Sequence, residues 1–234
     1  MTASGDLPVD VWTWSLDIDE ALAAKLSAWL TGEERKRASA FVTPQLQCRW
    51  IAARAGMRGI LASVLGVSPQ TPVFALGPHG RPELAGVDSP CSFNLSHSES
   101  LGAFSVSEAA VGVDVEQIKA LPEGVAGMVF SKTEIAALEA APEDARAVVF
   151  YRYWTAKEAV LKALGTGLSV SGRSFTIDIS RPETPRLVSA DWKDEDTQAW
   201  QLAAFHPKDG FAGAVAVRTQ RPLRLNLQSW SFGE

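Results

Sequence analysis

Two short segments hold the residue types that phosphoryl chemistry requires. In the first, Val111–Glu116, three valines alternate with Gly112, Asp114 and Glu116, a pattern typical of a half-buried strand. If the valines face a core, Asp114 and Glu116 share a hydrated face, with their backbones roughly 6.5–7 Å apart. Two carboxylates on one face can bind a hard divalent cation.

The second segment, Trp154–Lys162, is predicted to be a helix. Trp154, Glu158 and Lys162 stand four residues apart, so their side chains lie near one face. A third carboxylate beside a lysine would complete a magnesium site with a phosphate at its open positions. An ordinary explanation also exists, because strands often carry acids on a solvated face and Glu158 before Lys162 is a favourable helix ion pair.

A third segment, Phe93–Ser98, reads Phe-Asn-Leu-Ser-His-Ser, and a strand-like stretch, Gly102–Ser107, follows it. The order of these three motifs resembles the 4′-phosphopantetheinyl transferases, and within them the longer type that activates surfactin synthetase. Gly165–Leu168 matches the glycine loop that follows the family's catalytic helix. The resemblance runs from about Gly80 to Leu168.

The resemblance implies an α+β fold: a pseudo-dimer of two similar α+β halves with the active site in the cleft between them. We place the N-terminal half at residues 1–108 and the C-terminal half, which carries the metal site, at residues 109–234. Because one chain of the long type supplies both halves, we expect a monomer.

The implied activity is the transfer of 4′-phosphopantetheine from coenzyme A to a serine of an apo acyl, aryl or peptidyl carrier protein, with release of 3′,5′-ADP. Asp114, Glu116 and Glu158 match the family's magnesium ligands. Asp114, Glu158 and Lys162 are the catalytic candidates: Lys162 would contact the pyrophosphate and the leaving group, and Glu158 would activate the serine directly or through a water.

The nucleotide end of coenzyme A needs cationic or hydrogen-bonding partners. Ser96 and His97 match the pair that holds the 3′-phosphate, and Arg81 lies in a Gly-Arg-Pro turn where arginine can bind a phosphate with two hydrogen bonds. Arg49 matches an arginine of the family's long N-terminal helix. Arg37 and Arg54 match less closely, and either can be an ordinary surface residue.

Two other functions remain open on the sequence alone. One is a coenzyme A-binding or carrier-binding module that has lost catalysis; the other is a metal-dependent pyrophosphatase. The carrier and its pathway are not specified. Because carrier surfaces are usually acidic, we expect a docking patch that mixes apolar and basic residues from 119–140: Lys119, Met128, Val129, Phe130 and Lys132.

Composition narrows the classes of function. A chain of 234 residues with 46% hydrophobic residues can bury a sizeable core, and its net charge of −5 argues against non-specific nucleic-acid binding. No apolar run approaches the length of a membrane span, the first residues do not resemble a signal peptide, and Cys48 and Cys91 have no metal-like spacing. We expect a cytoplasmic protein with no membrane contact.

Periodicity and end signals place the elements. We predict helices at 19–30, 31–41, 44–65, 122–129, 131–140 and from 142 to about 165, with Pro44 opening the longest N-terminal helix and Gly66 ending it. Ser131 and Glu134 are spaced as a capping box, and Lys157 would be structural or would lie behind the residues that contact the ligand. Predicted strands are 9–16, 92–95, 102–107, 110–117, 175–179, 186–190, 200–206, 211–218 and 225–232.

Overall fold

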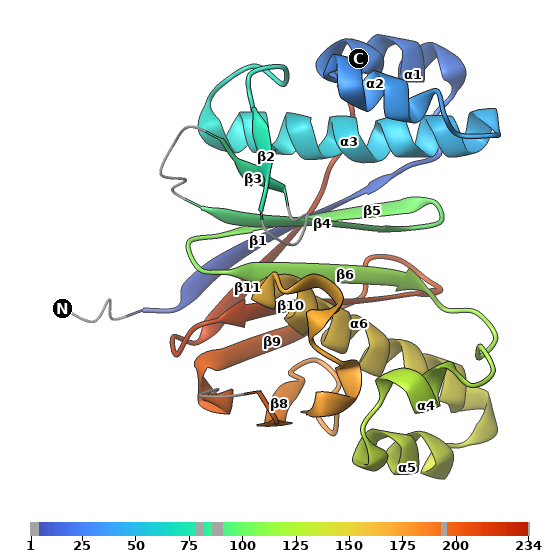
Figure 1. Cartoon of the computed structure of the whole chain (residues 1–234), viewed down its shortest axis with the longest axis vertical. Coiled ribbons are helices and arrows are strands. Elements are labelled where there is room, and N and C mark those ends of the chain that lie inside the picture. The colour runs from blue at the N-terminus through green and yellow to red at the C-terminus, as the bar shows by residue number, and fades with distance from the viewer. Residues whose placement is uncertain (1–4, 78–81, 86–90, 193–195, 234) are drawn as a thin grey trace.

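A computed structural model of the chain has four layers: a long helix, two stacked sheets and a second long helix (Figure 1). The structure describes residues 5–77, 82–85, 91–192 and 196–233. Helix α3 (Pro44–Leu65) covers the outer face of the first sheet, and α6 (Arg146–Leu164) covers the outer face of the second. The predicted mixture of helices and strands is therefore confirmed.

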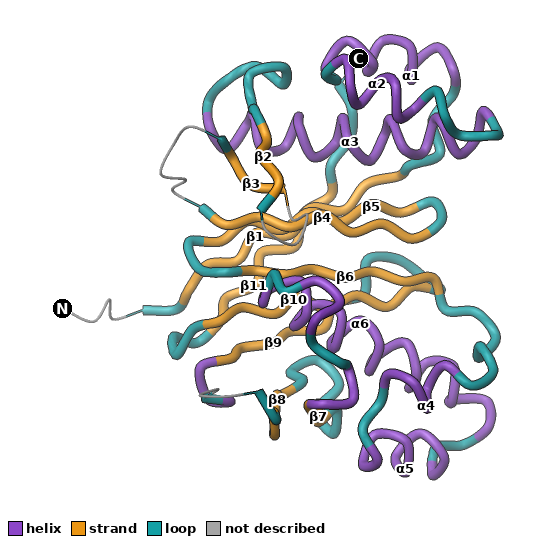
Figure 2. The backbone as a smooth tube through the Cα atoms, in the orientation of Figure 1, coloured by secondary structure: helices purple, strands orange, loops and turns teal. Residues whose placement is uncertain are grey.

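Shorter helices accompany each long one, and Figure 2 shows them gathered at the two ends of the stack. They are α1 (Glu20–Leu26), α2 (Gly32–Ala38), α4 (Val125–Val129) and α5 (Lys132–Ala140). Single 3-10 turns occur at Ser27–Trp29, Glu143–Ala145, Gly167–Ser169, Gly172–Ser174 and Thr197–Ala199. No helix in these described ranges is long and apolar enough to cross a membrane.

The first sheet has the strand order β11-β1-β5-β4, in which β1 and β11 are parallel and the other pairs antiparallel. The second sheet has the order β6-β10-β9 and is antiparallel. Their strands are β1 (Leu7–Ser15), β4 (Ser92–Ser98), β5 (Leu101–Ser107), β6 (Val111–Gln117), β9 (Trp200–Phe205), β10 (Phe211–Arg218) and β11 (Leu223–Ser229). Two small hairpins lie outside them: β2 (Phe74–Leu76) with β3 (Pro82–Leu84), and β7 (Phe175–Asp178) with β8 (Arg186–Ala190).

The ends of the long helices follow from their local sequence. Thr43 caps α3 with a hydroxyl that accepts the Leu46 N–H, and Pro44 occupies the first turn, where its missing N–H is not needed. Gly66 and Gly165 end α3 and α6 in the left-handed region, each with φ of 68°. The predicted bounds of α3 are confirmed.

Three apolar layers hold the stack together. Between the sheets lie the inward side chains of β1, β5, β6 and β10, chiefly valines. The outer face of each sheet packs against its own helix: Phe104 and Val106 against α3, and the alanines of β10 against α6. Each sheet is thus apolar on both faces, as buried sheets usually are.

Helix α6 lies unusually close to β6 because of one glycine. A Cβ on Gly112 would come within 2.1 Å of the Ala159 carbonyl oxygen, so any other residue would push the helix away. This close approach places the last turns of α6 directly over the polar side chains of β6.

The last strand joins a distant part of the chain. Although β11 comes from the end of the sequence, it pairs with β1 in the first sheet. Beyond it, Trp230 and Phe232 pack near α3 and Trp29, so the final residues hold the first layer together.

Candidate active site

Strands β4 and β6 lie side by side at the edges of their two sheets, and polar side chains join them. Alternate residues of β4 face β6 and accept hydrogen bonds from its backbone. These bonds run from Val111 N–H to Ser92 Oγ (3.3 Å), Val113 N–H to Asn94 Oδ1 (2.9 Å) and Gln117 N–H to Ser98 Oγ (3.2 Å). The remaining residue of the row, Ser96, donates to the Asp114 side chain instead. We call these four residues, Ser92, Asn94, Ser96 and Ser98, the seam ladder.

Asp114 lies at the centre of the seam and is only 3% exposed. Its Oδ1 accepts hydrogen bonds from Lys162 Nζ (2.6 Å) and Ser96 Oγ (2.9 Å), and Lys162 also donates to Ser96 (2.8 Å). Its Oδ2 is buried and has no hydrogen-bond partner among the residues that the structure describes. Burial raises the pKa of Asp114 against the opposing effect of Lys162.

The expectation that Asp114 lies on a hydrated face is wrong. The valines of β6 do face a core, but the opposite face is covered by α6, since Gly112 admits the helix backbone. Alternation along a strand shows that two faces differ; it does not show what covers the polar one.

Glu116 and Glu158 complete the group of acids. Ser98 Oγ donates to Glu116 Oε2 at 2.6 Å, and burial raises the pKa of Glu116. Burial also raises the pKa of Glu158, and the Asp114 carboxylate raises it further. Within the described chain, the Glu158 carboxylate makes no hydrogen bond.

These side chains line a single cavity of about 300 Å³. The expected residues Ser96, His97, Asp114, Glu116, Glu158 and Lys162 all contribute to its wall, together with Leu95 and Trp154. The structure therefore brings together six of the nine predicted site residues.

The cavity has the chemistry of a site for a hard divalent cation. Three carboxylates face it. One buried oxygen of Asp114 has no hydrogen-bond partner in the described ranges, which is costly unless something binds it. A cation would also relieve the repulsion among the acids. As they stand, no three His, Cys, Asp or Glu side chains of the described ranges are gathered closely enough to enclose an ion.

His97 lies on the opposite side of β4 from the seam ladder, toward α3. The residue is exposed overall, yet desolvation by the surrounding protein still lowers the pKa of His97. The nearby positive charges of Lys162 and Arg54 lower it further. The positive charges of Lys162 and Arg54 thus both lie near His97, which suits a ligand with several phosphates.

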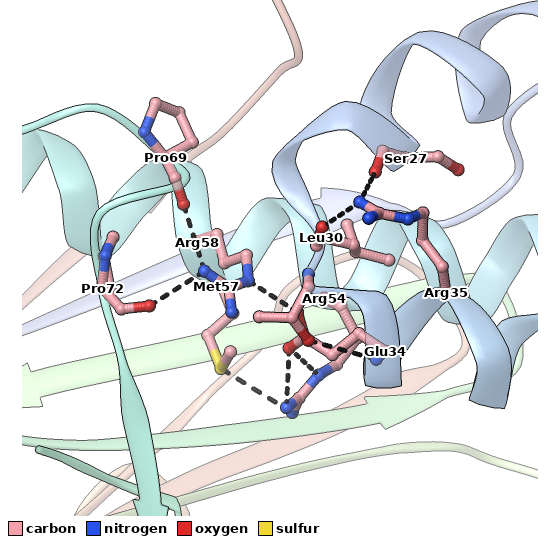
Figure 3. A network of polar contacts seen from close by, with 10 residues as sticks. Ser27, Leu30, Glu34, Arg35, Arg54, Met57, Arg58, Pro69 and Pro72 are labelled. Atoms are coloured by element: carbon pink, nitrogen blue, oxygen red, sulfur yellow. Dashed lines mark hydrogen bonds and ion pairs between the residues drawn. The ribbon is translucent and has the colours of Figure 1, made fainter.

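Arg54 is held in place by a network on α3 (Figure 3). Glu34 accepts from Arg54 through Oε1 (3.1–3.2 Å) and from Arg58 through Oε2 (2.9 Å). Arg58, which is 1% exposed, also donates to the carbonyl oxygens of Pro69 (3.3 Å) and Pro72 (3.0 Å). Sequence reasoning missed this role, and the i, i+4 spacing of the two arginines was its only sign.

The remaining arginines lie elsewhere. Arg49 pairs with Asp17 (2.7 Å) and Glu99 (3.1 Å) and lines a second cavity of about 500 Å³ beside the start of α3. Arg37 is exposed on α2. Arg81 lies outside the described residues. Glu99 also pairs with Lys119, and its φ of 50° is the one positive value among the described non-glycine residues.

Comparison with known proteins identifies the family of the chain. The profile of the 4′-phosphopantetheinyl transferase superfamily matches residues 110–216. The transferase HetI of Nostoc sp. is 33% identical over 214 residues, which cover 89% of this chain and 87% of HetI. The chain belongs to this superfamily. It is a 4′-phosphopantetheinyl transferase, an enzyme that moves phosphopantetheine from coenzyme A to carrier proteins.

Two other relatives illustrate the range of the family. The transferase Sfp of Bacillus subtilis is 25% identical over 153 residues, which span 65% of this chain and 68% of Sfp. The holo-[acyl-carrier-protein] synthase of Thermotoga maritima is 26% identical, with a TM-score of 0.40 over 48% of this chain and 64% of that one. That structural similarity is too weak to define the fold.

Several residues close to the cavity stabilise the fold instead of contributing to its wall. Lys157 and Glu134, both fully buried, pair at 2.8 Å, and Lys157 also donates to the Phe175 carbonyl oxygen (2.7 Å). The Ser131–Glu134 capping box is present. Phe130, which we expected in a docking patch, is also fully buried, packed against Phe150 and Tyr153. That expectation is wrong because Phe130 faces the core under α6.

Proposed function

We propose that the cavity between β4, β6 and α6 is the active site of this transferase. There a serine hydroxyl of an apo carrier protein would attack the β-phosphorus of coenzyme A. The bond between that phosphorus and the bridging oxygen would break, and 3′,5′-ADP would leave. The observation that carries the proposal is the buried Asp114 oxygen without a partner, in a cavity shared with Glu116, Glu158 and Lys162.

Asp114, Glu116 and Glu158 would hold Mg²⁺, whose preference for oxygen ligands suits three carboxylates. When bound, the ion supplies positive charge that stabilises the phosphoryl group during transfer. The residues fit because each acid keeps at least one oxygen without a hydrogen bond in the described part of the chain.

Lys162 would bind the pyrophosphate, since its ammonium reaches the cavity while Asp114 and Ser96 fix its position. Glu158 would receive the proton of the carrier serine, directly or through a water. It lines the cavity, and its carboxylate makes no hydrogen bond with the described residues.

Ser96 and His97 would bind the nucleotide end of coenzyme A, with Arg37, Arg49 and Arg81 as further phosphate partners. Ser96 and His97 have the stronger support because both line the cavity. Arg49 would first have to leave the carboxylates of Asp17 and Glu99.

The division at residues 108 and 109 would make the two sheets, each with its long helix, the halves of a pseudo-dimer. Strand β11 qualifies this division, because it belongs to the second stretch but adds to the first sheet. Since both halves are in one chain, the transferase would act as a monomer in the cytoplasm. Sedimentation in which activity follows an obligate dimer or trimer would contradict this.

The test is conversion of several purified apo carrier proteins, read by intact mass. The proposal requires a gain of one phosphopantetheine group, loss of that gain with excess EDTA, and its return with Mg²⁺. A module that only binds coenzyme A or the carrier would bind without any gain in mass. Such an outcome, with carriers that a known transferase modifies, would refute the proposed function.

A further inference from the structure

The hydrogen-bond partners of the seam ladder on β6 change along its length. On β6, its first two members, Ser92 and Asn94, accept hydrogen bonds from backbone N–H groups. Its last two reach carboxylates: Ser96 donates to Asp114, and Ser98 donates to Glu116. The strand edge that joins the two sheets is therefore also the surface that orients two of the proposed metal ligands.

The hydrogen bonds of Ser98 direct its hydroxyl proton to Glu116. Its Oγ accepts the Gln117 N–H (3.2 Å), so its single proton is directed to Glu116 Oε2 (2.6 Å). A short bond to a carboxylate belongs to the stronger class of hydrogen bonds. The Glu116 side chain, otherwise free to rotate, is thereby fixed at one oxygen.

The bond leaves the other oxygen of Glu116 available. In the described part of the chain Oε1 has no hydrogen-bond partner, and Asp114 repeats this pattern with Oδ1 bound and Oδ2 unpaired. Each acid of β6 is thus held by one serine of β4 through one oxygen, with the second oxygen free to bind a cation.

We propose that Ser98 is a positioning residue that holds the Glu116 carboxylate for the divalent metal. This inference rests on the proposed metal site and adds a residue to it. Ser96 is a poorer candidate for a test, because it also binds Lys162 and is expected to contact coenzyme A, so its loss would have several effects. Ser98 bonds only to Glu116 and Gln117 in the described ranges.

The test compares Ser98→Ala with Ser98→Thr. Outer partners of metal ligands typically contribute 10- to 100-fold to metal affinity. We expect Ser98→Ala to weaken binding of Mn²⁺ to the complex with coenzyme A by about 10-fold, measured by electron paramagnetic resonance without a carrier protein. The Mg²⁺ concentration for half-maximal transfer should rise in parallel, and Ser98→Thr, which keeps the hydroxyl, should restore both.

Ser92→Ala is the matched control, since it removes a bond of the same strand edge to a β6 backbone N–H rather than to Asp114 or Glu116. It should leave Mn²⁺ binding unchanged. Equal weakening by Ser92→Ala and Ser98→Ala would mean that the seam acts only as a structural contact, and wild-type binding by Ser98→Ala would also overturn the inference.

Glu116→Gln separates the two levels of the proposal. If this variant binds Mn²⁺ as tightly as the wild type, Glu116 is no metal ligand, and both the metal site and the role of Ser98 are wrong. If Glu116→Gln weakens binding while Ser98→Ala does not, only the inference about Ser98 fails.

Discussion

The helices on the outer side of each sheet are joined by the same arrangement: a glutamate of a short helix pairs with a buried cation of the long helix. Thr31 and Ser131 each open a capping box whose third helical residue is a glutamate, Glu34 or Glu134. Each glutamate also binds a buried cation from the next long helix: Arg58 on α3 and Lys157 on α6. The local sequences differ, yet both pairs lock two helices together.

The two long helices differ at the residue that directly follows this buried cation. On α3 it is Gly59, which packs against the rings of Trp29 and Trp230. On α6 it is Glu158, which lines the cavity. Helix α3 therefore uses this position for packing, whereas α6 uses it for chemistry.

The buried carboxylates show the same contrast. Both oxygens of Glu34 are hydrogen-bonded, while one oxygen of Asp114 has no partner in the part of the chain that the structure describes. A buried acid whose two oxygens are both hydrogen-bonded stabilises the fold. A buried acid with an unpaired oxygen is available to bind a ligand. Removing the charge of Asp114 should therefore act mainly on transfer activity, and removing that of Glu34 mainly on stability.

The largest expected effect follows Asp114→Asn. If Asp114 binds the metal, the loss of several kcal/mol of charge stabilisation would reduce kcat/KM by about 100- to 1,000-fold. The free energy of unfolding should change little. The loss of the ion pair with Lys162, whose side chain is 26% exposed, is offset because a buried carboxylate with an unpaired oxygen is itself costly. Steady-state transfer and chemical denaturation measure the two quantities.

Asp209→Asn serves as a control for that variant, because Asp209 is exposed in the turn between β9 and β10. It should change neither quantity. A large loss of stability in Asp114→Asn would place Asp114 with Glu34 as a structural acid and remove the contrast.

Glu34→Gln should act on stability. It would leave Arg58, which is 1% exposed, without its ionic partner, and breaking a buried pair costs about 3–5 kcal/mol. Urea denaturation should show this loss in the midpoint. Glu33→Gln, on the same helix but exposed, should change the free energy of unfolding by less than about 0.5 kcal/mol.

Much of the fold and of the candidate site could be predicted from the sequence, because the signals for them are local. Pro44, Gly66 and Gly165 gave correct helix ends, and the spacing of Ser131 and Glu134 predicted their capping box. The motifs also identified six residues that the fold brings to one cavity.

What sequence reasoning missed depends on contacts between distant segments. The burial of Asp114 depends on where α6 lies, and only Gly112, on the same face, suggested a close approach. The pairing of β11 with β1 joins the two ends of the chain and has no local sign. The seam ladder did have one: alternate polar residues from Ser92 to Ser98, facing neither core.

His97 should contribute less than the acids, and only to substrates that carry the 3′-phosphate. A hydrogen bond to a charged group is worth about 1.5–3 kcal/mol. We therefore expect His97→Ala to reduce kcat/KM for coenzyme A by about 10-fold or more, mainly through KM. With dephospho-coenzyme A the same variant should lose little; equal losses with both substrates would assign His97 to another part of the site.

The smallest expected effect concerns Asp178, a fully paired acid in the same half as the cavity but on the surface. Hydrogen bonds from Arg186 (2.8 Å) and from the Ser180 N–H (2.8 Å) lower the pKa of Asp178 from 3.8 to about 2. The pair therefore stabilises the fold above pH 3.8, and this contribution is lost as the pH falls through about 2. Because Arg186 is 64% exposed, solvent screening limits the contribution to roughly 0.5 kcal/mol.

Asp178→Asn should thus lower the free energy of unfolding slightly at pH 7. The difference from the wild type should shrink in acid, and transfer activity should be unaffected. If Asp178→Asn instead impaired catalysis as Asp114→Asn is expected to do, position in the second half, and not an unpaired oxygen, would be what marks a functional acid.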